Sequence, residues 1–135
     1  MQEHLSPNNT LTRKIYRKVD QYCMALDIST VNGIIIIPLV RRFDADSAPA
    51  IEAELKKIAA QRPERVLFDF SKTEYIASAG LRVLLVISRS ILKTGGAVAL
   101  SSLSPPVRQV FEIGGFTQIF SVFDSREEAL RSLQK

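Results

Sequence analysis

Short apolar runs alternate with longer helical patterns along most of this chain, and that alternation limits its possible folds more than any other feature. The strand-like runs lie at residues 34–40, 66–70, 97–101 and 119–123. Between them, apolar residues recur at intervals of three and four, which is the period of an amphipathic helix. Parallel strands need long crossover connections, usually helices. The pattern predicts an α/β domain of order β-β-α-β-α-β-α-β-α, with a mixed sheet of four to five strands and about four helices.

Turn and cap residues set the expected bounds of these elements. Asn32-Gly33 is a two-residue turn that predicts a hairpin between residues 24–30 and 34–40. One helix is expected to start at Asp46 or Ser47 and to end before Pro63, and a second to run from Ser78 to Lys93. Two more are expected after Ser104-Pro105-Pro106 and after Ser125, which forms a capping box with Glu128. The second of these helices should bury a stripe made of Leu81, Leu84, Leu85, Ile91 and Leu92.

Residues 1–23 differ in pattern from the rest, so the domain is expected over residues 24–135. The segment is polar at first, and then Leu11, Ile15 and Val19 follow at helical spacing. This predicts an N-terminal extension that is partly helical or disordered. The alternative is that Met24 is the true start of the protein. The basic residues at positions 13–18 of this extension could face an acidic partner or a membrane surface, although a solvent-exposed face is the expected arrangement.

Composition argues against several classes of function. Of the 18 basic and 14 acidic residues, the 14 basic and 12 acidic ones after residue 23 are interspersed, whereas nucleic-acid sites gather Lys and Arg on one face. No apolar run approaches the roughly 20 residues of a membrane helix. The single cysteine, Cys23, cannot form an internal disulfide, and the N-terminus lacks the apolar core of a secretory signal. A cytoplasmic protein without direct nucleic-acid contact or membrane span is therefore expected.

The residues that most enzyme classes require are missing from the expected domain. The only histidine, His4, lies in the N-terminal segment, so a serine or cysteine nucleophile has no histidine base. Gly95-Gly96 precedes a strand rather than a helix, the reverse of a phosphate-binding loop. We therefore expect no catalysis, metal or cofactor. A hydrolase that uses the carboxylates Asp44, Asp69 and Glu74 remains an alternative.

One segment combines a strand, a loop and a helix start with unusually small side chains. Residues 68–82 read FDFSKTEYIASAGLR, and Ser78 stands where the loop gives way to the helix. Small residues flank it on both sides, so no bulky neighbour should shield its hydroxyl. Serine is also a favoured N-cap, and local chemistry alone leaves that structural role open.

This segment resembles the signature of the STAS family, the sulfate-transporter and anti-sigma-factor-antagonist domain. The family pattern D-[LF]-S-x-x-x-x-[IM]-[DSA]-S-[SA]-G-L matches residues 69–81. The resemblance continues through residues 43–49, 95–100, 104–107 and 111–119, so that it covers about residues 24–133.

The resemblance implies a bacterial anti-sigma factor antagonist that works by partner switching. In such proteins the serine corresponding to Ser78 is phosphorylated by the partner, an anti-sigma factor that is also a serine kinase of the histidine-kinase-like ATPase class. A PP2C-type phosphatase reverses the reaction. Asp44 matches an acidic loop residue near the phosphoacceptor. The implied contacts for the partner are Asp44, Ala77, Ala79, Gly80, Leu81, Arg82, Val83 and Val86.

Several alternatives stay open beside this interpretation. Gly80 has a structural explanation in close packing, and cover by neighbouring helices is an alternative explanation for the apolar residues Val83, Val86 and Ile87. Ala77 replaces an aspartate that many phosphorylated members carry, and Arg41 replaces a common glycine. A second function is therefore retained: a STAS subunit that docks on the ATPase of a membrane transport assembly without being phosphorylated. The oligomeric state is not predicted.

Overall fold

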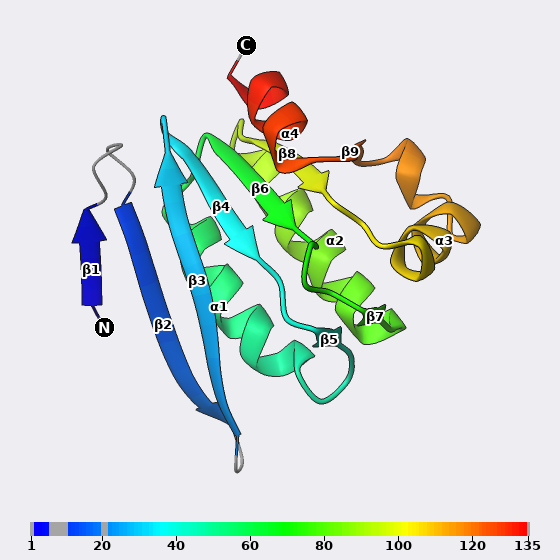
Figure 1. Cartoon of the computed structure of the whole chain (residues 1–135), viewed down its shortest axis with the longest axis horizontal. Helices are drawn as coiled ribbons and strands as arrows, with labels where there is room; N and C mark the ends of the chain where they lie inside the picture. The colour runs from blue at the N-terminus through cyan, green and yellow to red at the C-terminus, as the bar shows by residue number, and fades with distance from the viewer. Residues whose placement is uncertain (1, 6–10, 20–21, 135) are drawn as a thin grey trace.

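A seven-stranded mixed sheet forms the centre of the computed structural model, which describes residues 2–5, 11–19 and 22–134 (Figure 1). The strand order is β1-β2-β3-β4-β6-β8-β9. The first four strands pair antiparallel, and β4, β6, β8 and β9 pair parallel. The strands are β1 (Gln2–Leu5), β2 (Leu11–Val19), β3 (Tyr22–Val31), β4 (Ile34–Pro38), β6 (Arg65–Asp69), β8 (Ala97–Ser101) and β9 (Ser121–Phe123).

Four α-helices accompany the sheet, and the predicted α/β class is confirmed. They are α1 (Ala48–Ala60), α2 (Ser78–Lys93), α3 (Pro105–Ile113) and α4 (Arg126–Leu133), with a short 3-10 helix η1 (Phe116–Gln118) after α3. Because β4, β6 and β8 run parallel, their carboxyl ends lie at one edge of the sheet, where the loops that lead to α1, α2 and α3 begin. In residues 2–5, 11–19 and 22–134, no helix has the length and hydropathy that a bilayer crossing requires.

The central strands are apolar on both faces because helices cover both faces of the sheet. Ile37 and Phe68 join the larger core under α1 and α2, whereas Ile36 and Leu67 join a smaller core with α4. Successive residues of a strand point to opposite faces, so an unbroken run such as Ile34–Ile37 fills both cores at once. The sheet is thus a rigid base from which the loops at its carboxyl edge project.

The predicted hairpin and the predicted cap of α4 are confirmed, whereas Ser47 and Ser104 stand at the N-cap positions of α1 and α3 without a side-chain cap hydrogen bond. Asn32 and Gly33 connect β3 to β4 with positive φ values of 51° and 80°, the conformation that a tight two-residue turn requires. Ser125 accepts a hydrogen bond from the backbone N–H of Glu128 at 3.2 Å and so caps α4.

The predicted helix in the N-terminal segment is wrong. The backbone of Leu11–Val19 forms β2, which pairs with β3 from Leu11 opposite Thr30 to Val19 opposite Tyr22. Positions 11, 15 and 19 are spaced by four, and a spacing of four also returns to the same face of a strand. The strand β3 offers an edge for pairing, and the backbone hydrogen bonds of a ladder outweigh the small helical preference of such a short segment.

The predicted buried stripe of α2 is also only partly right. The buried residues of the helix are Gly80, Val83, Leu84, Ile87, Ser88 and Ile91, whereas Leu92 is 52% exposed. Leu81 and Leu85 are partly buried and pack at the margin of the core. The helix carries apolar residues around most of its circumference, so periodicity alone did not fix which face turns inward.

Candidate functional site

The loop that carries Ser78 is fixed to the loop after β4 by a two-stranded parallel ribbon. This β5–β7 ribbon joins β5 (Arg42–Phe43) to β7 (Tyr75–Ile76), with Arg42 opposite Tyr75 and Phe43 opposite Ile76. The backbone N–H of Glu74 donates to the carbonyl of Arg41 at 2.8 Å, and that of Ala77 donates to the carbonyl of Phe43 at 3.0 Å. The ribbon was not predicted because two-residue strands carry no readable periodicity.

The two faces of the β5–β7 ribbon differ in burial. Phe43 and Ile76 point into the main core, where they are 0% and 3% exposed. Arg42 and Tyr75 point outward, and the Arg42 guanidinium lies 4.7 Å from the centre of the Tyr75 ring. Anchoring on the inner face and a cation–π contact on the outer face hold the ribbon in one position. Ala77 and Ser78 continue directly from it.

Ser78 is the first residue of α2 and is exposed to solvent. Ala77 occupies the N-cap position with an extended backbone, at φ −109° and ψ 174°. Ser78 is therefore not the cap of the helix, and the structural explanation for this serine is wrong. A side chain at the first position of a helix lies beside backbone N–H groups that have no partner within the helix. The expected exposure of the hydroxyl agrees with the structure.

Gly80 brings the start of α2 against β5. A Cβ atom at this position would lie 2.5 Å from the backbone oxygen of Phe43 and 2.8 Å from its Cγ. Only a glycine allows so close an approach, so Gly80 has the structural role and is buried. Its predicted contact with a partner is wrong, because a buried backbone position offers nothing at the surface.

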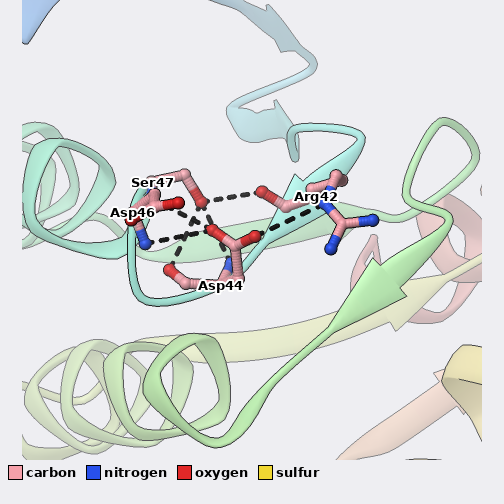
Figure 2. Close-up of polar contacts among 4 residues, drawn as sticks. All are labelled: Arg42, Asp44, Asp46 and Ser47. Atoms are coloured by element: carbon pink, nitrogen blue, oxygen red, sulfur yellow. Dashed lines mark hydrogen bonds and ion pairs between the residues drawn. The ribbon is translucent and has the colours of Figure 1, made fainter.

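Asp44 lies directly after β5 and organises the turn that starts α1, as Figure 2 shows. Its Oδ1 accepts hydrogen bonds from the backbone N–H groups of Asp46 at 3.1 Å and Ser47 at 3.2 Å. The Ser47 Oγ accepts from the Asp44 N–H in return, at 3.1 Å. The Asp44 Oδ2 faces the Arg42 Nε at 3.4 Å.

These contacts determine the charge state of Asp44. Its burial acts to raise the pKa, but the hydrogen bonds from Ser47 and Asp46 and the charge of Arg42 outweigh that effect. The pKa of Asp44 is therefore lower than its ordinary value, and the group is an anion at neutral pH. The register of the ribbon ends at Phe43 opposite Ile76, and Asp44 and Ala77 are the residues that follow these two in the chain.

The outer face of α2 is smaller than the sequence predicted. Val83 and Ile87 are 0% and 2% exposed, so Val83 belongs to the core and its assignment as a partner contact is wrong. Val86 is 40% exposed and Arg82 and Arg89 are exposed, which leaves a mixed apolar and basic surface beyond Ser78. Ala77, Ala79 and Leu81 are half-buried at the margin of this surface.

Arg82 makes a contact that the sequence did not reveal. Its Nη2 lies 3.4 Å from Glu52 Oε1 on α1, and the other carboxylate oxygen of Glu52 lies 3.8 Å from the Lys56 Nζ. The Arg82 side chain is 65% exposed and that of Glu52 is 17% exposed, and a pair with one exposed partner at such a distance contributes little to stability. Glu52 falls outside the motif, and only the packing of α1 against α2 brings it near.

An ion pair between a buried carboxylate and a partly exposed arginine supports the other end of the serine loop. Asp69, the first residue of the motif, is 2% exposed at the carboxyl end of β6. One of its oxygens accepts from the backbone N–H of Ser71 at 3.0 Å, and the other accepts from the Arg126 guanidinium in α4. The loop is therefore fixed at its start by α4 and at its end by β5.

The three carboxylates of the hydrolase alternative are not brought together as a reactive group. Asp69 pairs with Arg126, and Glu74 pairs with Arg41 at 3.0 Å. Asp44 accepts hydrogen bonds from backbone N–H groups of the turn in which it lies. Within the part of the chain that the structure describes, no three side chains of the His, Cys, Asp or Glu type gather as metal ligands. What the site presents is an exposed serine on a rigid support.

Known proteins resemble this chain in both sequence and structure. BtrV of Bordetella bronchiseptica, a candidate anti-sigma factor antagonist, is 39% identical over 106 residues, which cover 78% of this chain and 91% of BtrV. The unphosphorylated form of the anti-sigma factor antagonist SpoIIAA superimposes with a TM-score of 0.70 at 22% identity, covering 81% of this chain and 96% of SpoIIAA. The phosphorylated form of the Bacillus cell fate determinant SpoIIAA gives 0.64 at 21% identity, covering 79% and 97%.

At these identities the two solved structures establish the fold alone. The family is established by sequence, because the model of the STAS domain matches residues 25–129 and the match with BtrV spans nearly its whole length. The motif around Ser78, the β5–β7 ribbon and the start of α2 all lie within the matched residues. The chain belongs to the STAS domain family.

Proposed function

We propose that this chain is an anti-sigma factor antagonist that captures a serine-kinase anti-sigma factor and is switched off by phosphorylation of Ser78. The observation that carries the proposal is the exposed Ser78 at the first position of α2, anchored by the β5–β7 ribbon. The names of BtrV and SpoIIAA support the role, and SpoIIAA has both an unphosphorylated and a phosphorylated form. The chain acts by binding in the cytoplasm, and a PP2C-type phosphatase restores it.

The position of Ser78 explains how one phosphate can change binding without unfolding the domain. A helix N-terminus has unpaired N–H donors and a partial positive charge, so a phosphate is tolerated there. A partner that covers Ser78 would have to bury about −1.5 to −2 charges with strongly hydrated oxygens. If that burial costs about 3 kcal/mol, the affinity falls roughly a hundredfold. Such a change is enough to redirect a kinase between two competing partners.

The direct test is phosphate transfer from a purified candidate anti-sigma factor kinase of the same organism. With ATP, the wild-type protein should gain one phosphate, and Ser78→Ala should gain none. Ser71→Ala is the matched control, because Ser71 is an exposed serine of the same loop and its replacement should leave labelling intact. Equal labelling of wild type and Ser78→Ala would refute the site.

A binding measurement tests the switch separately from the phosphorylation site. Ser78→Glu should fold as the wild type does and should bind the kinase roughly a hundred times more weakly. Unchanged binding by Ser78→Glu would contradict the charge mechanism, even if Ser78 is the phosphorylated residue.

Ala77 keeps a second candidate function in view. Because this chain has alanine where many phosphorylated members have aspartate, a STAS subunit that docks on a transport ATPase without phosphorylation remains the alternative. Affinity purification of the full chain from its native cells distinguishes the two functions. Recovery of a soluble kinase supports the antagonist, and recovery of a transporter ATPase supports the alternative.

A further inference from the structure

We infer that Arg82 receives the phosphate of Ser78 within the same molecule and leaves Glu52 to do so. This inference rests on the proposed function, because it describes what the chain does with a phosphate once Ser78 carries one. It adds a second consequence of phosphorylation. The basic side chain next to the serine is then withdrawn from the surface that a partner would contact.

The helix geometry brings Arg82 to Ser78. The two residues are four positions apart on α2, so they lie on the same face and about 6 Å apart along the axis. Side chains on a helix point toward its N-terminus, which directs the Arg82 guanidinium toward the level of Ser78. Both residues are exposed, so no packed side chain has to move.

The present partner of Arg82 can release it at little cost. The Arg82 to Glu52 contact is 3.4 Å, at the long end for a hydrogen bond, and the Arg82 side chain is 65% exposed. Glu52 also faces Lys56 at 3.8 Å, so the carboxylate keeps a cation after Arg82 leaves. Among the described residues, this cluster joins two cations to one carboxylate. An anion added nearby can therefore pair with Arg82 while Lys56 stays with Glu52.

The strength of the new pair favours the exchange. A phosphoserine carries about −1.5 to −2 charges near neutral pH, against −1 for a carboxylate that Lys56 already shares. Planar guanidinium groups also bind phosphate oxygens in a bidentate manner. The charged groups at the β5–β7 ribbon are already paired with one another, Arg42 with Asp44 at 3.4 Å and Arg41 with Glu74 at 3.0 Å.

The test measures the second ionisation of the phosphate by ³¹P NMR. Phosphoserine is installed at position 78 during translation, so the protein is obtained without any kinase. The titration midpoint of the wild-type protein should lie about 0.3 pH unit below that of Arg82→Gln, because Arg82 stabilises the dianion. Arg82→Lys, which keeps the charge, should restore most of the difference. The difference should shrink at 1 M salt, where charges on the surface are screened.

Two control variants make the result specific. Arg89→Gln removes an exposed arginine from the same outer face of α2. Arg89 lies about 16 Å from Ser78 along the helix axis, so this variant should titrate as the wild type does. Arg42→Gln removes the nearest arginine on the ribbon. The inference is refuted if Arg82→Gln titrates as the wild type, or if Arg42→Gln raises the midpoint and Arg82→Gln does not. Failure of the kinase to label Ser78 would refute the proposed function and leave this measurement unaffected.

Discussion

Replacing Gly80 by alanine should destabilise the protein although alanine is the better helix former. The added Cβ would meet the backbone oxygen of Phe43 at 2.5 Å, well inside van der Waals contact, and that oxygen also accepts the hydrogen bond of Ala77. Overpacking of this kind costs about 1–3 kcal/mol. Alanine returns up to about 1 kcal/mol of helix propensity. Because the clash is with backbone rather than with a flexible side chain, the cost should lie in the upper half of its range, and the net loss in the free energy of unfolding should be about 1–2 kcal/mol.

Thermal unfolding followed by circular dichroism checks this prediction. A loss of that size lowers the Tm of a domain of 135 residues by about 5 °C. Ser90→Ala, at an exposed position of the same helix, is the control and should be neutral or slightly stabilising. Gly80→Ala should also slow phosphorylation of Ser78 at a temperature where the variant is folded, because the start of α2 moves away from β5. A Tm equal to or above that of the wild type would show that α2 does not depend on this close approach.

Three further predictions concern the core, the turn at Asp44 and the last helix. Val83→Ala should lower the free energy of unfolding in urea by about 2 kcal/mol. Val86→Asp, at an exposed position, should lower it by less than about 0.5 kcal/mol but should weaken kinase binding. The reverse order of stabilities would contradict the assignment of Val83 to the core. Because the pKa of Asp44 is lowered, its carboxylate adds stability at neutral pH, so the stability difference between wild type and Asp44→Asn should begin to shrink as the pH falls below about 4, the unfolded-state value, and should vanish only below the lower folded-state pKa. Ser125→Ala removes the cap of α4 and should cost about 1 kcal/mol, measurable in the same unfolding experiment.

Elements whose sequence pattern matched a local physical rule were predicted closely. The bounds of α2 and β8 agree with the structure, because caps, glycines and an uninterrupted apolar pattern mark them. The isoleucine run of β4 was identified as a strand from its β-branched residues. The sequence did not reveal that β4 is buried on both faces, because the second face is covered by α4.

Other features depended on contacts between distant segments and could not be predicted. Spacing by four suits a helix and a strand equally, so only the exposed edge of β3 decided the conformation of residues 11–19. The β5–β7 ribbon exists because Phe43 and Ile76 fill the same core from different loops. Val83 was placed at the surface because α2 is apolar on several sides, and the inward face was chosen by α1 and the sheet.

The ion pair between Asp69 and Arg126 makes α4 part of the base of the loop that leads to Ser78. The two residues are 57 positions apart, yet unwinding the first turn of α4 would leave a buried carboxylate without its cation. A truncation or fusion that disturbs the last ten residues should therefore be interpreted as a change at the serine loop, and not as the trimming of an inert tail.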